Sequence, residues 1–240
     1  MELIDFSQGF DTLLNSYAVA AGFGNTDNPV SIECDEYEKS LLLTQAQENF
    51  VISLYNGKNS SGDSFEATEE MRRYLSNLIK EASLSPITTT SGAPLGVESN
   101  SKFFTLPDDL WFITYESVNV SDGKCENESS LDVYPVRQDE YRKLRKNPFR
   151  GANDRRALRL DLADNVVEVV SKYTVGSYYV RYLKKLSPII LEDLPDGMTS
   201  NGVGTATNCM LHDALHQKIL ELAVQTAIQT RGYVRNNNRE

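Results

Sequence analysis

The sequence has 240 residues, a net charge of −10, 40% hydrophobic residues and 24% charged residues. This composition is ordinary for a globular protein with a core of its own. No run approaches the roughly 18 consecutive apolar residues of a membrane span, and the first residues lack the basic start of a secretory signal. Three widely spaced cysteines, Cys34, Cys125 and Cys209, favour reduced thiols over a disulfide framework. We therefore expect no membrane contact.

The acidic balance argues against a protein that grips nucleic acid over its whole surface, because phosphate binding requires cations. The charge is compatible with a surface past which DNA slides without sticking, or with solubility alone.

Basic side chains gather between residues 137 and 159. Nine basic and three acidic residues give this segment +6, so the net −10 leaves −16 for the rest of the chain. The segregation indicates charge-complementary contact between subunits. A solvated helix face with a loop explains it equally well, and local phosphate contact is a third interpretation. The basic residues are Arg137, Arg142, Lys143, Arg145, Lys146, Arg150, Arg155, Arg156 and Arg159.

Helical patterns dominate residues 1–84, which we assign to the N-terminal part of a helical bundle. Apolar spacing predicts helices over residues 5–21 and from Asp35 to Tyr55, and a third helix over roughly 68–82. Asp35 is placed to cap the second helix, with Glu38 three residues later. The apolar stripe predicted for that helix comprises Tyr37, Leu41, Ala46, Phe50, Val51 and Leu54.

Residues 85–105 are rich in Ser, Thr, Pro and Gly, which is typical of a long loop. Either it is an arm that reaches a neighbour, or it is an unstructured connection.

Strand-like patterns fill residues 106–192, which we assign to an inserted antiparallel β domain of about four to six strands. A short basic helix over residues 137–144 interrupts them. The predicted strands are 110–120, 131–136, 157–162, 166–170 and 173–186.

Residues 193–240 complete the predicted fold. A helix over about 208–231 would close the bundle, and a polar tail follows it. The predicted class is α+β: a helical bundle with an inserted small antiparallel β domain and a long C-terminal helix.

Cys209, His212 and His216 are the first candidates for chemistry, because on a helix their i, i+3, i+7 spacing shares one face. Such a set can bind zinc, or a cysteine–histidine pair can act as a nucleophile, given further ligands or an orienting group. Packing and hydrogen bonding within the bundle explain the same residues. The competing function is therefore a small intracellular metal-binding or cysteine enzyme, or a regulatory module.

Other patterns are weaker. Residues 202–204 read Gly-Val-Gly before a helix, but they lack the strand and lysine of a phosphate loop, which favours a hinge. Clustered tyrosines of 173–182 are suited to base stacking or to a subunit interface, and the acidic charge favours the interface. We predict no catalytic residue, metal or cofactor. The predicted interface comprises Arg142, Arg145, Arg150, Tyr178 and Tyr179.

Several sequence blocks, taken together, resemble head-to-tail connector proteins, in particular the ring proteins in the neck of crAss-like tailed bacteriophages. A strand-to-helix block also resembles the tail-tubular adaptors of podoviruses. The blocks are 35–47, 54–57, 65–75, Leu-Pro-Asp-Asp-Leu-Trp at 106–111, Asn-Pro-Phe-Arg-Gly-Ala at 147–152, and 178–216.

This resemblance implies a virion structural protein rather than an enzyme, made in the host cytoplasm and placed in the neck or tail. It implies a homo-oligomeric ring, typically twelvefold, that joins the portal protein to other neck or tail ring proteins and lines a channel for passing DNA. It also implies that the C-terminal helix and tail reach toward the portal.

Overall fold

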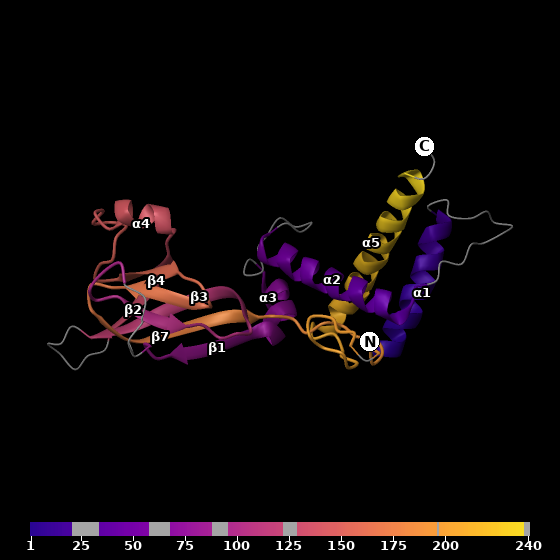
Figure 1. The fold of residues 1–240 in the computed structure, drawn as a ribbon, viewed down its shortest axis with the longest axis horizontal. Coiled ribbons are helices and arrows are strands. Elements are labelled where there is room, and N and C mark those ends of the chain that lie inside the picture. Colours follow the sequence, from indigo (N-terminus) through magenta and orange to yellow (C-terminus); the bar gives the residue numbers. More distant parts are fainter. Residues whose placement is uncertain (21–33, 58–67, 88–95, 122–128, 196, 238–240) are drawn as a thin grey trace. The chain divides into compact units, whose positions relative to one another are not determined.

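The computed structural model describes residues 1–20, 34–57, 68–87, 96–121, 129–195 and 197–237 (Figure 1). Two compact units result: residues 1–78 with 186–240, here called the helical unit, and residues 79–185, the sheet unit. The elements in chain order are α1 (Leu3–Ala20), α2 (Glu36–Tyr55), α3 (Glu69–Leu75), η1 (Ser76–Leu78), β1 (Ile79–Leu84), β2 (Lys102–Thr105), β3 (Leu110–Ser121), β4 (Ser129–Pro135), α4 (Gln138–Leu144), β5 (Arg156–Asp161), β6 (Val166–Val170), β7 (Thr174–Lys184), η2 (Asp213–Leu215) and α5 (His216–Asn237).

Helices α1, α2 and α5 form the body of the helical unit, and α5 packs against both of the others (Figure 1). Phe6, Phe10 and Leu14 recur every fourth residue of α1 and are fully buried. Gly9 allows the close approach of α5, because a Cβ there would lie 2.9 Å from Leu220 Cδ2. The first two helices predicted from the sequence are confirmed over their described residues.

Helix α2 has the predicted ends but a different buried face. Asp35 caps it by accepting a 2.6 Å hydrogen bond from the Glu38 backbone N–H, and Gly57 follows its last turn with φ of 66°. The predicted apolar stripe is wrong at Leu41, whose exposed fraction is 41%. Three polar side chains spaced i, i+4, i+7 are buried instead: Ser40, Thr44 and Gln47.

These three polar residues are buried because they bond the backbone of the extended segment 187–191. The Thr44 hydroxyl accepts from the Ile189 N–H (3.0 Å) and donates to the Ile189 carbonyl (3.3 Å). Ser40 accepts from the Leu191 N–H, and the Gln47 amide donates to the Ser187 carbonyl. A buried polar group with its hydrogen bonds made carries no desolvation penalty, so polar residues replace the expected apolar stripe.

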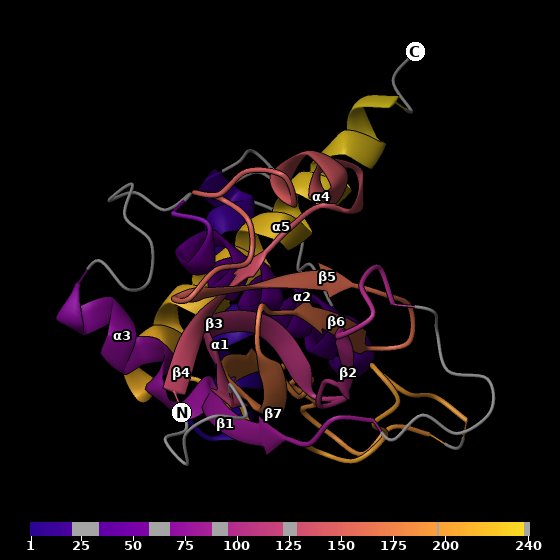
Figure 2. The ribbon, with the colours of Figure 1, turned by 90° about the vertical axis from the view of Figure 1, so that its left-hand side faces the viewer.

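The sheet unit is one curled seven-stranded sheet with strand order β1-β7-β3-β4-β5-β6-β2 (Figure 2). The strands predicted over 157–162 and 166–170 are present as β5 and β6 and form an antiparallel hairpin, which Asp164 and Asn165 turn with φ of 57° and 56°. Strands β4 and β5 are parallel, and the connection that contains α4 crosses between them. Every other pairing is antiparallel.

The predicted fold class, a helical bundle with a small inserted antiparallel β domain, is wrong. The described chain is a mixed protein in which a seven-stranded sheet dominates and contains a parallel pair. Two edge strands were not predicted: β1 falls where a third helix was expected, and β2 falls in the expected loop. Residues 88–95 of that loop lie outside the described residues, as does Cys125.

Tertiary pairing explains both local errors in secondary structure. All six residues 79–84 pair with residues 178–183 of β7, and this pairing outweighs their helical apolar spacing. The last helix starts at His216 and not near Asn208, because Thr207 pairs with Ile190 and His212 has an extended backbone. Among the described residues, no helix is both long and apolar enough to cross a membrane.

Candidate subunit interface

Helix α4 is fixed on the outer face of the sheet (Figure 2). Tyr141 packs with Leu158 and Leu160 of β5, and its hydroxyl donates a 2.9 Å hydrogen bond to Glu98. The same Glu98 carboxylate lies 2.6 Å from Arg145 Nε. Burial first, and then the Glu98 carboxylate, hold the pKa of Tyr141 far above its ordinary value, so the phenol remains a donor. These contacts give the basic segment a rigid support.

The outward side of this segment carries several cations that form no ion pair with a described residue. Five side chains are exposed and form no ion pair with any described residue; together they are called the basic surface. By contrast, Arg137 pairs with Asp139, Arg145 pairs with Glu98, and Arg156 lies over the Tyr134 ring. The basic surface comprises Arg142, Lys143, Lys146, Arg150 and Arg155. Of the predicted arginines, Arg142 and Arg150 are therefore free to meet a partner.

Arg159 belongs to the same stretch of sequence but lies in the core. Its guanidinium contacts the Glu116 carboxylate at 2.7 Å, and both side chains are buried. Strand β5 is covered on both faces, with Ala157 and Arg159 toward the main core and Leu158 and Leu160 toward α4. Arg159 therefore adds nothing to the basic surface.

The tyrosines of β7 point to opposite faces of the sheet. Tyr178 is fully buried, and its hydroxyl donates a 2.5 Å hydrogen bond to Glu116. Tyr179 is half-buried, donates to Glu81, and lies beside the exposed Tyr115. Tyr182 is buried and donates to Asp109; burial first, and then that carboxylate, raise the pKa of Tyr182 to about 12. Because successive side chains of a strand point to opposite faces of the sheet, Tyr178 lies in the core and Tyr179 lies near the surface.

A candidate interface residue that the sequence reasoning missed is Phe149, which is 85% exposed. It sits in a tight loop after α4 in which Asn147 Oδ1 accepts from the backbone N–H groups of Phe149 (2.9 Å) and Arg150 (3.2 Å). Gly151 closes the loop: a Cβ there would lie 2.8 Å from the Asn147 carbonyl oxygen. The Asn-Pro-Phe-Arg-Gly order is the signal for this turn, although it was used only as a family block.

Cys209, His212 and His216 do not share a helix face, because the first two precede α5. His212 caps η2 by accepting from the Ala214 N–H, and the Cys209 thiol lies 3.7 Å from Gln47 Oε1. The described residues hold no cluster of His, Cys, Asp or Glu side chains suited to a metal ion. The helical spacing that motivated a metal or cysteine site is therefore wrong.

His216 is buried, so its protonation should weaken the helical unit. Nε2 lies 3.1 Å from the Leu211 carbonyl, Nδ1 lies 3.0 Å from the Met1 nitrogen and 3.7 Å from Asp213. Burial is the largest cause that lowers the pKa of His216 below its ordinary 6.5. A lowered folded-state pKa gives stability that is present above 6.5 and is lost as pH falls toward the folded-state pKa.

We therefore expect the free energy of unfolding to fall between about pH 7.5 and pH 5.5, and His216→Gln to flatten this dependence. Denaturant unfolding at both pH values measures it. Equal slopes for wild type and His216→Gln would contradict the expectation.

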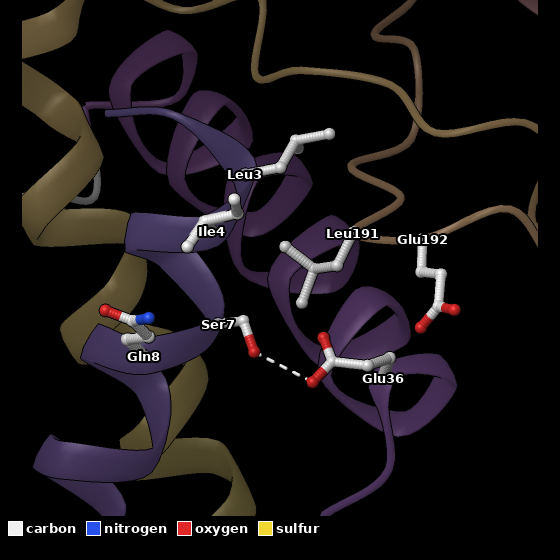
Figure 3. Close-up of a pocket in the computed structure, with 7 residues that line it drawn as sticks. All are labelled: Leu3, Ile4, Ser7, Gln8, Glu36, Leu191 and Glu192. Carbon is white, nitrogen blue, oxygen red and sulfur yellow. Dashed lines mark hydrogen bonds between the residues drawn. The ribbon is translucent and has the colours of Figure 1, made fainter.

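A pocket of about 330 Å³ lies in the helical unit, at the start of α1 (Figure 3). Leu3, Ile4 and Leu191 give it an apolar lining, and Ile4 is 69% exposed. Glu36 and Glu192 add two carboxylates. Glu36 accepts from Ser7 (2.8 Å) and pairs with Lys39, whereas Glu192 forms no ion pair with any described residue. Ser7 and Gln8 complete the lining. The pocket thus has an apolar side and a polar side, and the polar side carries a carboxylate, Glu192, that no described cation neutralises.

Comparison with known proteins gives consistent matches over nearly the whole chain. Residues 1–239 match the family described as phage tail ring protein 3/4. The chain is 45% identical over 236 residues to ring protein 3 of Bacteroides phage crAss001, covering 97% of each protein. It is 29% identical over 236 residues to ring protein 4/5 of the same phage, covering 95% of this chain and 92% of that protein.

Proposed function

The chain belongs to the family of phage tail ring proteins 3/4, and on this premise we propose how it builds a ring in the virion neck or tail. The resemblance predicted from the sequence blocks is confirmed by this membership. The chain is a structural component of the virion, and it assembles as an oligomer with other ring and tail proteins.

The proposed mechanism is mechanical, with no catalytic residue. Identical copies close a ring through heterologous contacts, so one surface of a copy meets a different surface of the next. The observation that carries this proposal is the basic surface on α4 and its loop, rigidly held in a chain whose net charge is −10. Arg142 and Arg150 supply one side, and Arg145, which pairs with Glu98, belongs to the same segment. Tyr179 of β7 is a second proposed contact, whereas Tyr178 is fully buried in the core.

The remaining parts of the proposal follow from the resemblance. Twelve copies surround a channel through which DNA passes, and the acidic remainder of the chain repels the DNA backbone. The end of α5 reaches toward the portal protein, and neighbouring ring proteins stack on the other side. The chain is made in the host cytoplasm before it joins the virion.

Reversing Arg142 and Arg150 to Glu together is expected to lower ring formation at least about tenfold. A tenfold change corresponds to about 1.4 kcal/mol in the free energy of the contact between two copies. Arg145 is left in place because it holds Glu98. Negative-stain microscopy and sedimentation of the purified chain, alone and with its portal, measure ring formation.

The matched control is the double variant Arg72→Glu and Lys102→Glu, which changes the net charge equally at two residues that are not members of the basic surface. This control should assemble as wild type does. Equal assembly of the Arg142/Arg150 variant would contradict the proposed interface, and a wild-type chain that neither forms rings nor binds portal would contradict the ring itself.

A further inference from the structure

The side chain of Phe149 is almost uncovered in its own copy. Its side chain is 85% exposed, while the loop that carries it is closed by Asn147 and Gly151. Lys146 and Arg150 flank it, and neither pairs with a described residue. An apolar ring held outward on an ordered loop loses little conformational freedom when it binds, which is the property of an interface anchor.

The pocket at the start of α1 has the complementary character (Figure 3). A cavity of roughly 150 Å³ is enough for a benzene ring, so the 330 Å³ pocket accepts a phenyl group with room for part of an arginine side chain. Leu3, Ile4 and Leu191 supply apolar contact for the ring. Glu192, which no described cation neutralises, supplies the opposite charge to Arg150.

We propose that Phe149 of one copy inserts between Leu3, Ile4 and Leu191 of the next copy, with Arg150 of the first facing Glu192 of the second. This inference rests on the proposed ring. The occupant is a second copy because one chain carries both halves, a basic apolar anchor and an acidic apolar pocket. Two different surfaces on each copy make the contact heterologous, which a closed ring requires.

The contact is tested by placing the photo-crosslinking residue p-benzoylphenylalanine at position 149 of the full chain. Irradiation of the assembled protein should give an intermolecular cross-link to peptides that contain residues 3–8 or 191–192, identified by mass spectrometry. The same residue at Tyr115, another exposed aromatic position of the sheet unit, is the control and should not label those peptides. Cross-links from position 149 to any other site would overturn the inference.

A charge swap supplies the second measurement. Arg150→Glu and Glu192→Arg should each lower ring formation about tenfold, and the double variant should recover most of it; Phe149→Ala should lower it at least as much as either. If the wild type forms rings, Phe149→Ala forms them equally well and the double charge swap does not recover ring formation, this contact is overturned but the proposed ring is not. A wild-type chain that never assembles, alone or with its portal, would overturn the proposed function and this contact together.

Discussion

Arg159→Met, with Glu116 left in place, is expected to lower the free energy of unfolding of the sheet unit by about 3–5 kcal/mol. Both side chains are buried, and removal of Arg159 leaves the Glu116 carboxylate without its counter-charge. Burial raises the pKa of Glu116, and Arg159 is the main opposing influence that keeps the carboxylate charged. The positive charge of Arg159 therefore offsets the cost of burying the Glu116 carboxylate in the core.

The hydrogen bonds around this pair sharpen the expectation. Glu116 Oε2 accepts from both Arg159 and Tyr178. Arg159 Nε lies 2.9 Å from Asp161 Oδ1, yet it is not aligned for a hydrogen bond with any described residue. The guanidinium is thus held mainly by Glu116. Loss of Arg159 should cost less at low pH, because protonated Glu116 needs no counter-charge.

Denaturant unfolding followed by Trp111 fluorescence measures the effect in the sheet unit. The control is the triple variant Glu116→Leu, Arg159→Met and Tyr178→Phe, which removes every polar member of the network. It should be close to wild type in stability, since apolar replacement of a whole buried ion pair is often neutral. If Arg159→Met alone were as stable as the triple variant, the result would contradict the expectation that the buried Glu116 carboxylate depends on Arg159 as its counter-charge.

Sequence reasoning succeeded where a local signal decides the structure. The Asp35 cap, the end of α2 at Tyr55 and the two strands of the β5–β6 hairpin each depend on a few adjacent residues. Their chemistry is the same in the sequence as in the fold. These elements were therefore predicted correctly, within the described residues.

The structural predictions from the sequence are wrong where an element's structure depends on a partner far along the chain. Strand β1 is set by its pairing with β7, about 100 residues later, and the parallel β4–β5 pair is set by the crossover through α4. In the sequence Arg159 is one of nine clustered basic residues, which predicts a surface position. The structure places it in the core beside Glu116, 43 residues earlier. The proposed interface residues show the same division: Arg142 and Arg150 were proposed from charge, whereas Phe149 required the knowledge that its loop leaves it uncovered.

Thr44→Val is the second large change, and it is expected to lower the free energy of unfolding of the helical unit by about 2–4 kcal/mol. The substitution keeps the side-chain shape but removes the hydroxyl that both accepts from and donates to Ile189. Ile189 is fully buried, so its N–H and carbonyl would lose a partner that water cannot replace.

The matched control is Thr44→Ser, which keeps the hydroxyl and removes one methyl group, and should cost only about 1 kcal/mol. Denaturant unfolding compares the two variants, and equal losses would contradict a role for the hydroxyl. The same hydroxyl holds the segment that carries Leu191 and Glu192 into the pocket. Thr44→Val should therefore also weaken ring formation more than Thr44→Ser does, because a loosened segment no longer keeps that wall of the pocket in place for Phe149.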